Sequence, residues 1–166
     1  MHICGFGKSK REIAELCSGH AQIRLYPPRT PDGCLQFAQG CDVMVNPRPI
    51  VQGNENNFSS KVFEYALSGR AILTSHVSGV DQVLGPEAFY FDENGFDRSL
   101  DEALDRVAAI PRSELHRRGT SIQERILKTY SWSQQGERVA EFVLGVLAQL
   151  SCRSQSGEFS VPTLTA

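Results

Sequence analysis

The stretch NNFSSKVFEYALSGRAILTSHVSGVDQVL, residues 56–84, holds a short helix and a buried strand in direct succession. Residues 60–68 have the apolar spacing of a helix, and Gly69 stands in the usual position just beyond a helix end. The side chains that this spacing turns inward are Val62, Phe63, Ala66 and Leu67. The apolar run at 71–75 then predicts a strand, so the stretch indicates a helix that leads into a buried sheet.

The same rhythm runs through the first 92 residues, where short apolar runs alternate with helical patterns. The five runs are HICGF (2–6), AQIRLYPP (21–28), DVMVNP (42–47), AILTS (71–75) and AFYFD (88–92). Parallel neighbours in a sheet need a crossover connection, and a helix is the usual one. The pattern therefore predicts a Rossmann-like α/β fold, with a parallel sheet of about five strands and helices on both faces.

The rest of the chain has only helical patterns, in segments 97–110, 111–130 and 131–150. Ser131 or Ser133 is suited to cap the last of them. The final 16 residues, 151–166, have no apolar period and many small polar residues. We expect one domain over residues 1–150 and a disordered tail over 151–166.

Composition excludes several classes of protein. A net charge of −2 and a pI near 6.1 argue against a nucleic-acid partner. The five cysteines are odd in number and form no C-x-x-C pair, which argues against a disulfide framework and a zinc site. No signal peptide or long apolar run is present, so the sequence predicts a cytoplasmic protein without a bound metal.

The start of the helix in the opening stretch has the chemistry of an anion site. The first amides of a helix lack intrahelical partners, and with Ser59 as cap they would lie near Ser60. The Ser59 and Ser60 hydroxyls and the Lys61 ammonium add donors and charge. Glu64 lies roughly 6 Å further along the axis, where its carboxylate could accept two ribose hydroxyls. Spacing alone favours a simpler reading, a surface Lys61–Glu64 pair worth about 0.2–0.5 kcal/mol.

The residue types in this stretch also resemble the motif of a known family, which spacing alone does not reveal. FSSKVFEYALSGRAILTSHVSGVDQVL resembles the nucleotide-sugar signature of retaining glycosyltransferases of the GT-B fold, the group 1 or glycogen-synthase-like family. That family has a Pro-Ser-Lys-Leu-x-Glu-like helix followed by Ala-x-Gly-x-Pro-Val, a strand and a glycine-containing turn. The similarity extends upstream to CDVMVNPRP and downstream through AFYFD to YSWSQQGERVAEFV. It implies that residues 1–150 form the C-terminal, nucleotide-sugar-binding half of a GT-B enzyme.

The resemblance also implies roles for single residues. Glu64 takes the position that binds the nucleotide ribose, and Ser59, Ser60 and Lys61 take the segment that meets the diphosphate. Asn56 stands where the family often has a second glutamate near the donor sugar, so that contact would carry no charge. By the same resemblance, Gly5 and Gly7 would line the nucleotide crevice. Two further departures are Ser59 and Ala71, which stand where the family often has prolines.

The expected function is a glycosyltransferase domain that binds a nucleoside-diphosphate sugar, without another cofactor, and transfers the sugar to an acceptor hydroxyl. A non-catalytic nucleotide-binding or interaction domain and a sugar-nucleotide epimerase remain as alternatives. The sequence assigns no catalytic residue, base, donor sugar or acceptor.

The resemblance also implies that a part is missing. In the family, another strand precedes the one that HICGF resembles and lies between it and the strand that DVMVNP resembles. We therefore expect a fragment whose partners include a missing N-terminal domain or a second copy of itself. Alone, it should transfer sugar poorly.

Overall fold

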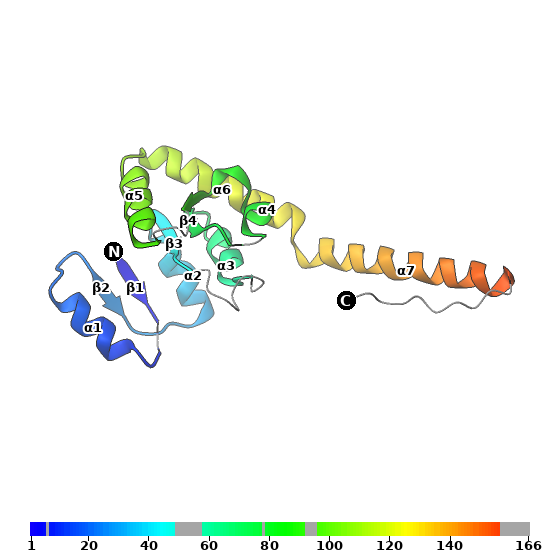
Figure 1. Cartoon of the computed structure of the whole chain (residues 1–166), viewed down its shortest axis with the longest axis horizontal. Coiled ribbons are helices and arrows are strands. Elements are labelled where there is room, and N and C mark those ends of the chain that lie inside the picture. Colours follow the sequence, from blue (N-terminus) through cyan, green and yellow to red (C-terminus); the bar gives the residue numbers. More distant parts are fainter. Residues whose placement is uncertain (6, 49–57, 78, 92–95, 157–166) are drawn as a thin grey trace. The chain divides into compact units, whose positions relative to one another are not determined.

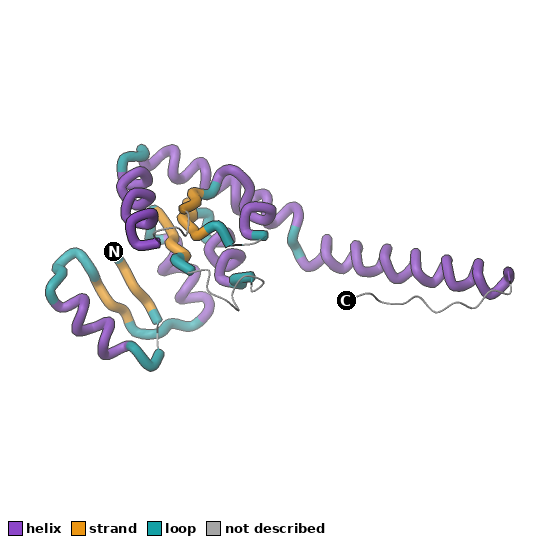
Figure 2. Tube along the Cα trace, in the orientation of Figure 1, coloured by secondary structure: helices purple, strands orange, loops and turns teal. Residues whose placement is uncertain are grey.

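The computed structural model describes residues 1–5, 7–48, 58–77, 79–91 and 96–156, and it alternates strands with helices (Figures 1 and 2). The chain divides into two compact units, Met1–Glu124 and Arg125–Ala166. The elements in order are β1 (His2–Cys4), α1 (Lys10–Ser18), β2 (Arg24–Tyr26), α2 (Pro31–Gln39), β3 (Val43–Asn46), α3 (Lys61–Leu67), β4 (Ala71–Ser75), α4 (Val80–Leu84), the 3-10 turn η1 (Gly85–Glu87), β5 (Phe89–Phe91), α5 (Phe96–Ala108), α6 (Arg112–Thr129) and α7 (Trp132–Ser156).

All five predicted strands form, and every pairing is parallel, as expected. β1 pairs with β2, with His2 opposite Arg24. The other three strands follow the order β3-β4-β5, with Val43 opposite Ala71 and Leu73 opposite Phe89. The strands thus form two parallel sheets, and among the described residues no strand of the first pairs with a strand of the second.

The three-stranded sheet is covered on both faces. Every residue of β4 is buried, which a strand reaches only when helices pack on both sides of its sheet. On one face a buried cluster joins β4 and β5 to α5 and α6 through Ala71, Leu73, Phe91, Ala103, Val107 and Leu115. α3 contacts β3 and β4 and contributes two fully buried side chains, Val62 and Ala66.

The inward face of α3 is narrower than the sequence predicted. Val62 and Ala66 are fully buried, but Phe63 is only half-buried and Leu67 is 40% exposed. The buried pair is spaced by four residues, so a single ridge of the short helix meets the sheet. Leu67 therefore does not belong to the core.

The turn after α3 is held by α6. Gly69 has φ +68, a left-handed conformation that ends the helix at low cost only for glycine. The Gln123 Nε2 donates to the Leu67 carbonyl oxygen at 2.6 Å and so satisfies one of the last carbonyls of α3. A Cβ on Gly119 would lie 2.4 Å from the Gly69 carbonyl oxygen, so only glycine allows α6 to approach this closely.

An ion-pair network ties the start of α6 to η1. Both Arg117 and Arg118 donate to the Glu114 carboxylate, at 2.7 and 2.8 Å, and Arg117 also reaches Glu87 at 3.1 Å. The guanidinium of Arg118 lies over the Phe89 ring at 4.8 Å. These two arginines of α6 therefore have structural partners.

The second unit contains the longest helix. Ser131, one of the two predicted caps, caps α7, because its Oγ accepts a hydrogen bond from the Gln134 amide at 3.3 Å. The helix continues past Leu150 to Ser156, and residues 157–166 lie outside the described residues. The division into a domain 1–150 and a tail stays a prediction. No described helix combines the length and apolar character that crossing a bilayer requires.

Candidate functional site

The start of α3 is one residue later than the sequence predicted. Ser60, not Ser59, precedes the first helical residue Lys61, and neither hydroxyl caps the helix by a hydrogen bond. The turn closes through the backbone, because the Val62 amide donates to the Ser59 carbonyl and the Phe63 amide to the Ser60 carbonyl, at 3.1 and 3.0 Å. Among the described residues, the amides of Ser60 and Lys61 donate to no group. Two backbone donors at this helix start thus have no partner in the described part of the chain.

The charged side chains of α3 are also free. Lys61 and Glu64 are both exposed, and no ion pair joins them to each other or to another described residue. The simple surface pair that spacing favoured is therefore not formed. Burial, and secondarily the charge of Glu64, raises the pKa of Tyr65. The ammonium and the carboxylate both remain available to a ligand.

The helix start lies beside the loop that follows β4. A Cβ built on Gly79 would meet the Phe58 ring at 3.9 Å, so the two segments are in contact. Phe58 in turn packs on Phe63, with ring centroids 5.5 Å apart, and so fixes the entry of the chain into α3. In a parallel sheet a helix between two strands begins near the carboxyl end of the first. Lys61 therefore lies at the carboxyl edge, where open α/β sheets bind their ligands.

A buried polar network at this edge was missed by sequence reasoning. The Asn46 Nδ2 donates to the Thr74 Oγ1 at 3.0 Å, and the Ser75 Oγ accepts from the Arg48 amide at 3.3 Å. Asn46 is 7% exposed, and Thr74 and Ser75 are fully buried. The only sequence signal was that polar residues end two otherwise apolar strands. These hydrogen bonds hold the ends of β3 and β4 together and make this edge of the sheet rigid.

The remaining predicted residues are less closely tied to α3. Gly5 and Gly7 follow β1 and are exposed, and a Cβ on either would meet nothing within 4 Å. Packing within the described residues therefore does not demand glycine at these positions. Asn56 lies outside the described residues, so its predicted contact to a donor sugar has no structural description. No three His, Cys, Asp or Glu side chains of the described part group as metal ligands.

The exit of β2 has its own aromatic cluster. The Tyr26 hydroxyl and the His2 Nδ1 are 2.9 Å apart, and the Tyr26 and Phe37 rings meet edge to face at 4.9 Å. The guanidinium of Arg29 lies 4.9 Å from the Phe37 centroid, within reach of a cation–π interaction. These contacts account for Tyr26 and Arg29 as parts of a rigid strand exit.

Comparisons with known proteins agree with this fold. The family model described as glycosyl transferase-like matches residues 8–141. None of the curated proteins compared with the chain matches it. Among solved structures, sucrose-phosphate synthase from Thermosynechococcus elongatus superposes with a TM-score of 0.71 at 16% identity, over 89% of this chain and 38% of its own. A glycosyltransferase from Rickettsia africae gives 0.68 at 10% identity, over 88% and 39%.

A third solved structure was determined with ligands. It is a variant of S. aureus TarM in complex with fondaparinux, α-GlcNAc-glycerol and UDP, with a TM-score of 0.64 at 17% identity over 84% of this chain. This chain spans 28% to 39% of the lengths of the three proteins. Because the family model matches most of the sequence and the fold agrees, the chain belongs to the glycosyl transferase-like family and has the α/β fold of a GT-B half.

Proposed function

We propose that this chain is the donor-binding half of a GT-B glycosyltransferase and binds a nucleoside-diphosphate sugar, whose sugar goes to an acceptor hydroxyl. The observation that carries the proposal is the start of α3. It presents two free amides, an unpaired ammonium and an unpaired carboxylate within residues 60–64, at the carboxyl edge of a parallel sheet. The family to which the chain belongs supports the same reading.

The diphosphate would meet the first residues of α3. The Ser60 and Lys61 amides and the Ser60 hydroxyl are donors for phosphate oxygens, and the Lys61 ammonium adds a full positive charge. Ser59 is 8% exposed, so its hydroxyl is the least accessible of the group. Fixed donors and charge at the departing diphosphate stabilise the negative charge that develops as the sugar leaves. This electrostatic role needs no movement of the helix.

The ribose would meet Glu64, and the sugar would meet residues outside α3. An ionised carboxylate only accepts hydrogen bonds, and Glu64 can take one from each of the two ribose hydroxyls. Asn56 would contact the donor sugar through its uncharged amide, while Gly5 and Gly7 would line the crevice with exposed backbone. These roles extend the proposal from α3 to the residues that follow β1 and to Asn56.

The rest of the enzyme would complete the fold and hold the acceptor. β1 and β3 each have one strand partner among the described residues, so each offers a free edge. We infer that a strand from a longer protein, or a second copy of this chain, pairs there. The chain alone is then expected to bind donor weakly and to transfer sugar poorly.

Calorimetric titration with UDP, GDP and ADP tests the donor site. Glu64→Gln should weaken binding of the preferred nucleotide about tenfold, the loss expected for one charge-assisted hydrogen bond. Asp105→Asn is the matched control, since Asp105 is another exposed helical carboxylate with no partner among the described residues. Equal binding by Glu64→Gln and the parent would contradict the ribose role.

The same protein decides between the functional alternatives. Hydrolysis or transfer from a nucleotide sugar, by the chain or by its longer form, would support the transferase. Interconversion of the free nucleotide sugar would instead indicate an epimerase. Binding without either reaction in the longer form would identify a non-catalytic domain.

A further inference from the structure

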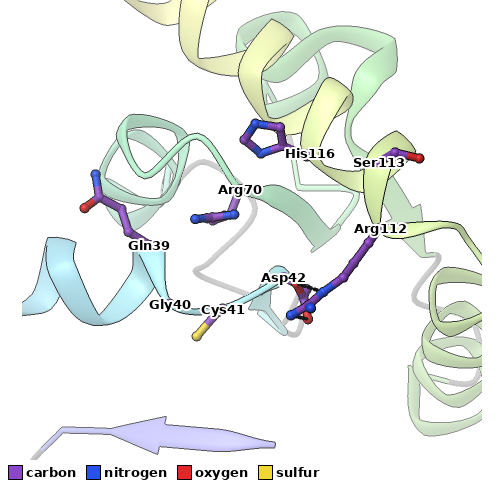
Figure 3. A pocket seen from close by; sticks show the side chains of 8 residues that line it. All are labelled: Gln39, Gly40, Cys41, Asp42, Arg70, Arg112, Ser113 and His116. Carbon is purple, nitrogen blue, oxygen red and sulfur yellow. Dashed lines mark hydrogen bonds and ion pairs between the residues drawn. The ribbon is translucent and has the colours of Figure 1, made fainter.

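A cavity of about 330 Å³ lies at the opposite edge of the three-stranded sheet (Figure 3). Asp42 comes directly before β3 and Arg70 directly before β4, so both mark the amino ends of parallel strands. The first turn of α6, from Arg112 to His116, forms another wall. The volume is within the range of small-molecule sites. The cavity is therefore distinct from the helix start where the donor is proposed to bind.

The charges in this cavity do not cancel. Arg112 donates to both carboxylate oxygens of Asp42, at 2.7 and 3.1 Å, so these two neutralise each other. Arg70 has no ion pair and no side-chain hydrogen bond with any described residue, and its Nε is fully buried without a partner. Figure 3 shows the Arg70 guanidinium among Gln39, His116 and the Asp42–Arg112 pair. Within the part of the chain that the structure describes, one positive charge is therefore left without a counter-ion.

No other group of the described lining supplies the missing negative charge. Asp42 is the only carboxylate there, and Arg112 occupies it. Burial, with Asp42 nearby, raises the pKa of the Cys41 thiol, so that group stays neutral. A partly buried positive charge without a counter-ion among the described residues is costly, and an anion bound in the cavity would supply that counter-ion.

The other polar groups in the cavity can donate hydrogen bonds. His116 offers a ring nitrogen, Gln39 offers its amide, and the Arg112 and Ser113 amides at the start of the 18-residue helix α6 donate to no described group. Free amides at a helix start and a guanidinium together form the usual receptor for a tetrahedral oxyanion.

We propose that this cavity binds a phosphate group, with Arg70 as the principal ligand and the first turn of α6 as the second. The source of the group is either inorganic phosphate or a small phosphomonoester. The proposal does not depend on the donor site, because none of its residues belongs to α3.

Calorimetric titration of the chain with inorganic phosphate and with glycerol 3-phosphate, at constant ionic strength, tests the proposal. Tighter saturable binding of one of them identifies the source. Arg70→Gln should weaken binding at least about tenfold, because it removes the only unpaired charge. Asp42→Asn should tighten binding severalfold, because it removes the one carboxylate and frees Arg112. Lys128→Ala removes an exposed lysine that belongs to neither site and should leave phosphate affinity unchanged.

The outcomes separate a binding role from a structural one. A structural role would lower the melting temperature of Arg70→Gln and Asp42→Asn alike, whereas the proposal requires opposite changes in phosphate affinity. If Arg70→Gln does not fold, Arg70→Lys keeps the charge but loses the paired donors, and it should still bind more weakly than the parent. Absence of saturable binding, or equal binding by the parent and the folded Arg70 variant, overturns the proposal.

Discussion

Replacing Gly119 by alanine should destabilise the first unit, because α6 touches the backbone that follows α3. An added Cβ would lie 2.4 Å from the Gly69 carbonyl oxygen, 2.5 Å from the Arg70 carbonyl carbon and 2.7 Å from the Ala71 amide nitrogen. None of these atoms is the end of a flexible side chain, so a whole segment must shift. Overpacking costs about 1–3 kcal/mol, and the upper end applies here. Alanine recovers about 1 kcal/mol of helix propensity, which leaves a net loss of about 2 kcal/mol.

Thermal and urea denaturation measure this loss. For a protein of this size, 2 kcal/mol corresponds to a fall in melting temperature of about 4–8 °C. Gly136→Ala and Gly145→Ala are matched controls in α7, where an added Cβ meets nothing within 4 Å, and each should gain up to about 1 kcal/mol. If Gly119→Ala were as stable as these controls, the close approach of α6 to residues 69–71 would be wrong.

Two further predictions concern the same helix. The guanidinium groups of Arg117 and Arg118 lower the pKa of Glu114 to about 2. Its stabilising effect is therefore fully present above about pH 4.5 and is lost as the pH falls towards 2. Glu114→Gln should reduce the change in the free energy of unfolding between pH 4.5 and pH 2, as measured by urea unfolding at a series of pH values. If the pH dependence were unchanged, the Glu114 ion pairs would not be its source. Gln123→Ala removes the 2.6 Å hydrogen bond to the Leu67 carbonyl and should cost about 1 kcal/mol in the same assay, and no change would mean that water replaces it.

The local pattern of the sequence was enough to predict the elements of the fold. Helix α3 follows directly from a helical period that ends just before Gly69, and strand β4 follows from the apolar run after it. The prediction that Leu67 is buried was wrong, because a helical period of 3.6 residues identifies the buried face but not its width. The sheet buries only the ridge formed by Val62 and Ala66. The separation of β1 from β3 was expected only from the family resemblance, which places a further strand between them, because no local pattern marks strand pairing.

The candidate sites also differ in how far they could be predicted from local sequence. The donor motif lies within six consecutive residues, 59–64, so its residue types and spacing could be recognised in the sequence alone. The Asn46–Thr74 hydrogen bond joins residues 28 positions apart, and no local pattern marks it. The cavity proposed to bind phosphate joins residues from Gln39 to His116. Its decisive feature, an Arg70 guanidinium without a partner among the described residues, is visible only once the neighbours are known.

α3 connects the two edges of the sheet. It begins at Lys61, where the proposed donor binds, and the chain reaches Arg70, in the phosphate cavity, three residues after it ends. Seven helical residues span only about 10 Å, and an intact helix of that length moves as one body. The contacts of Gly119 and Gln123 with residues 67–71 therefore also set the position of the Lys61 and Glu64 side chains. A substitution that shifts this turn should alter nucleotide affinity even though it lies at the far end of the helix.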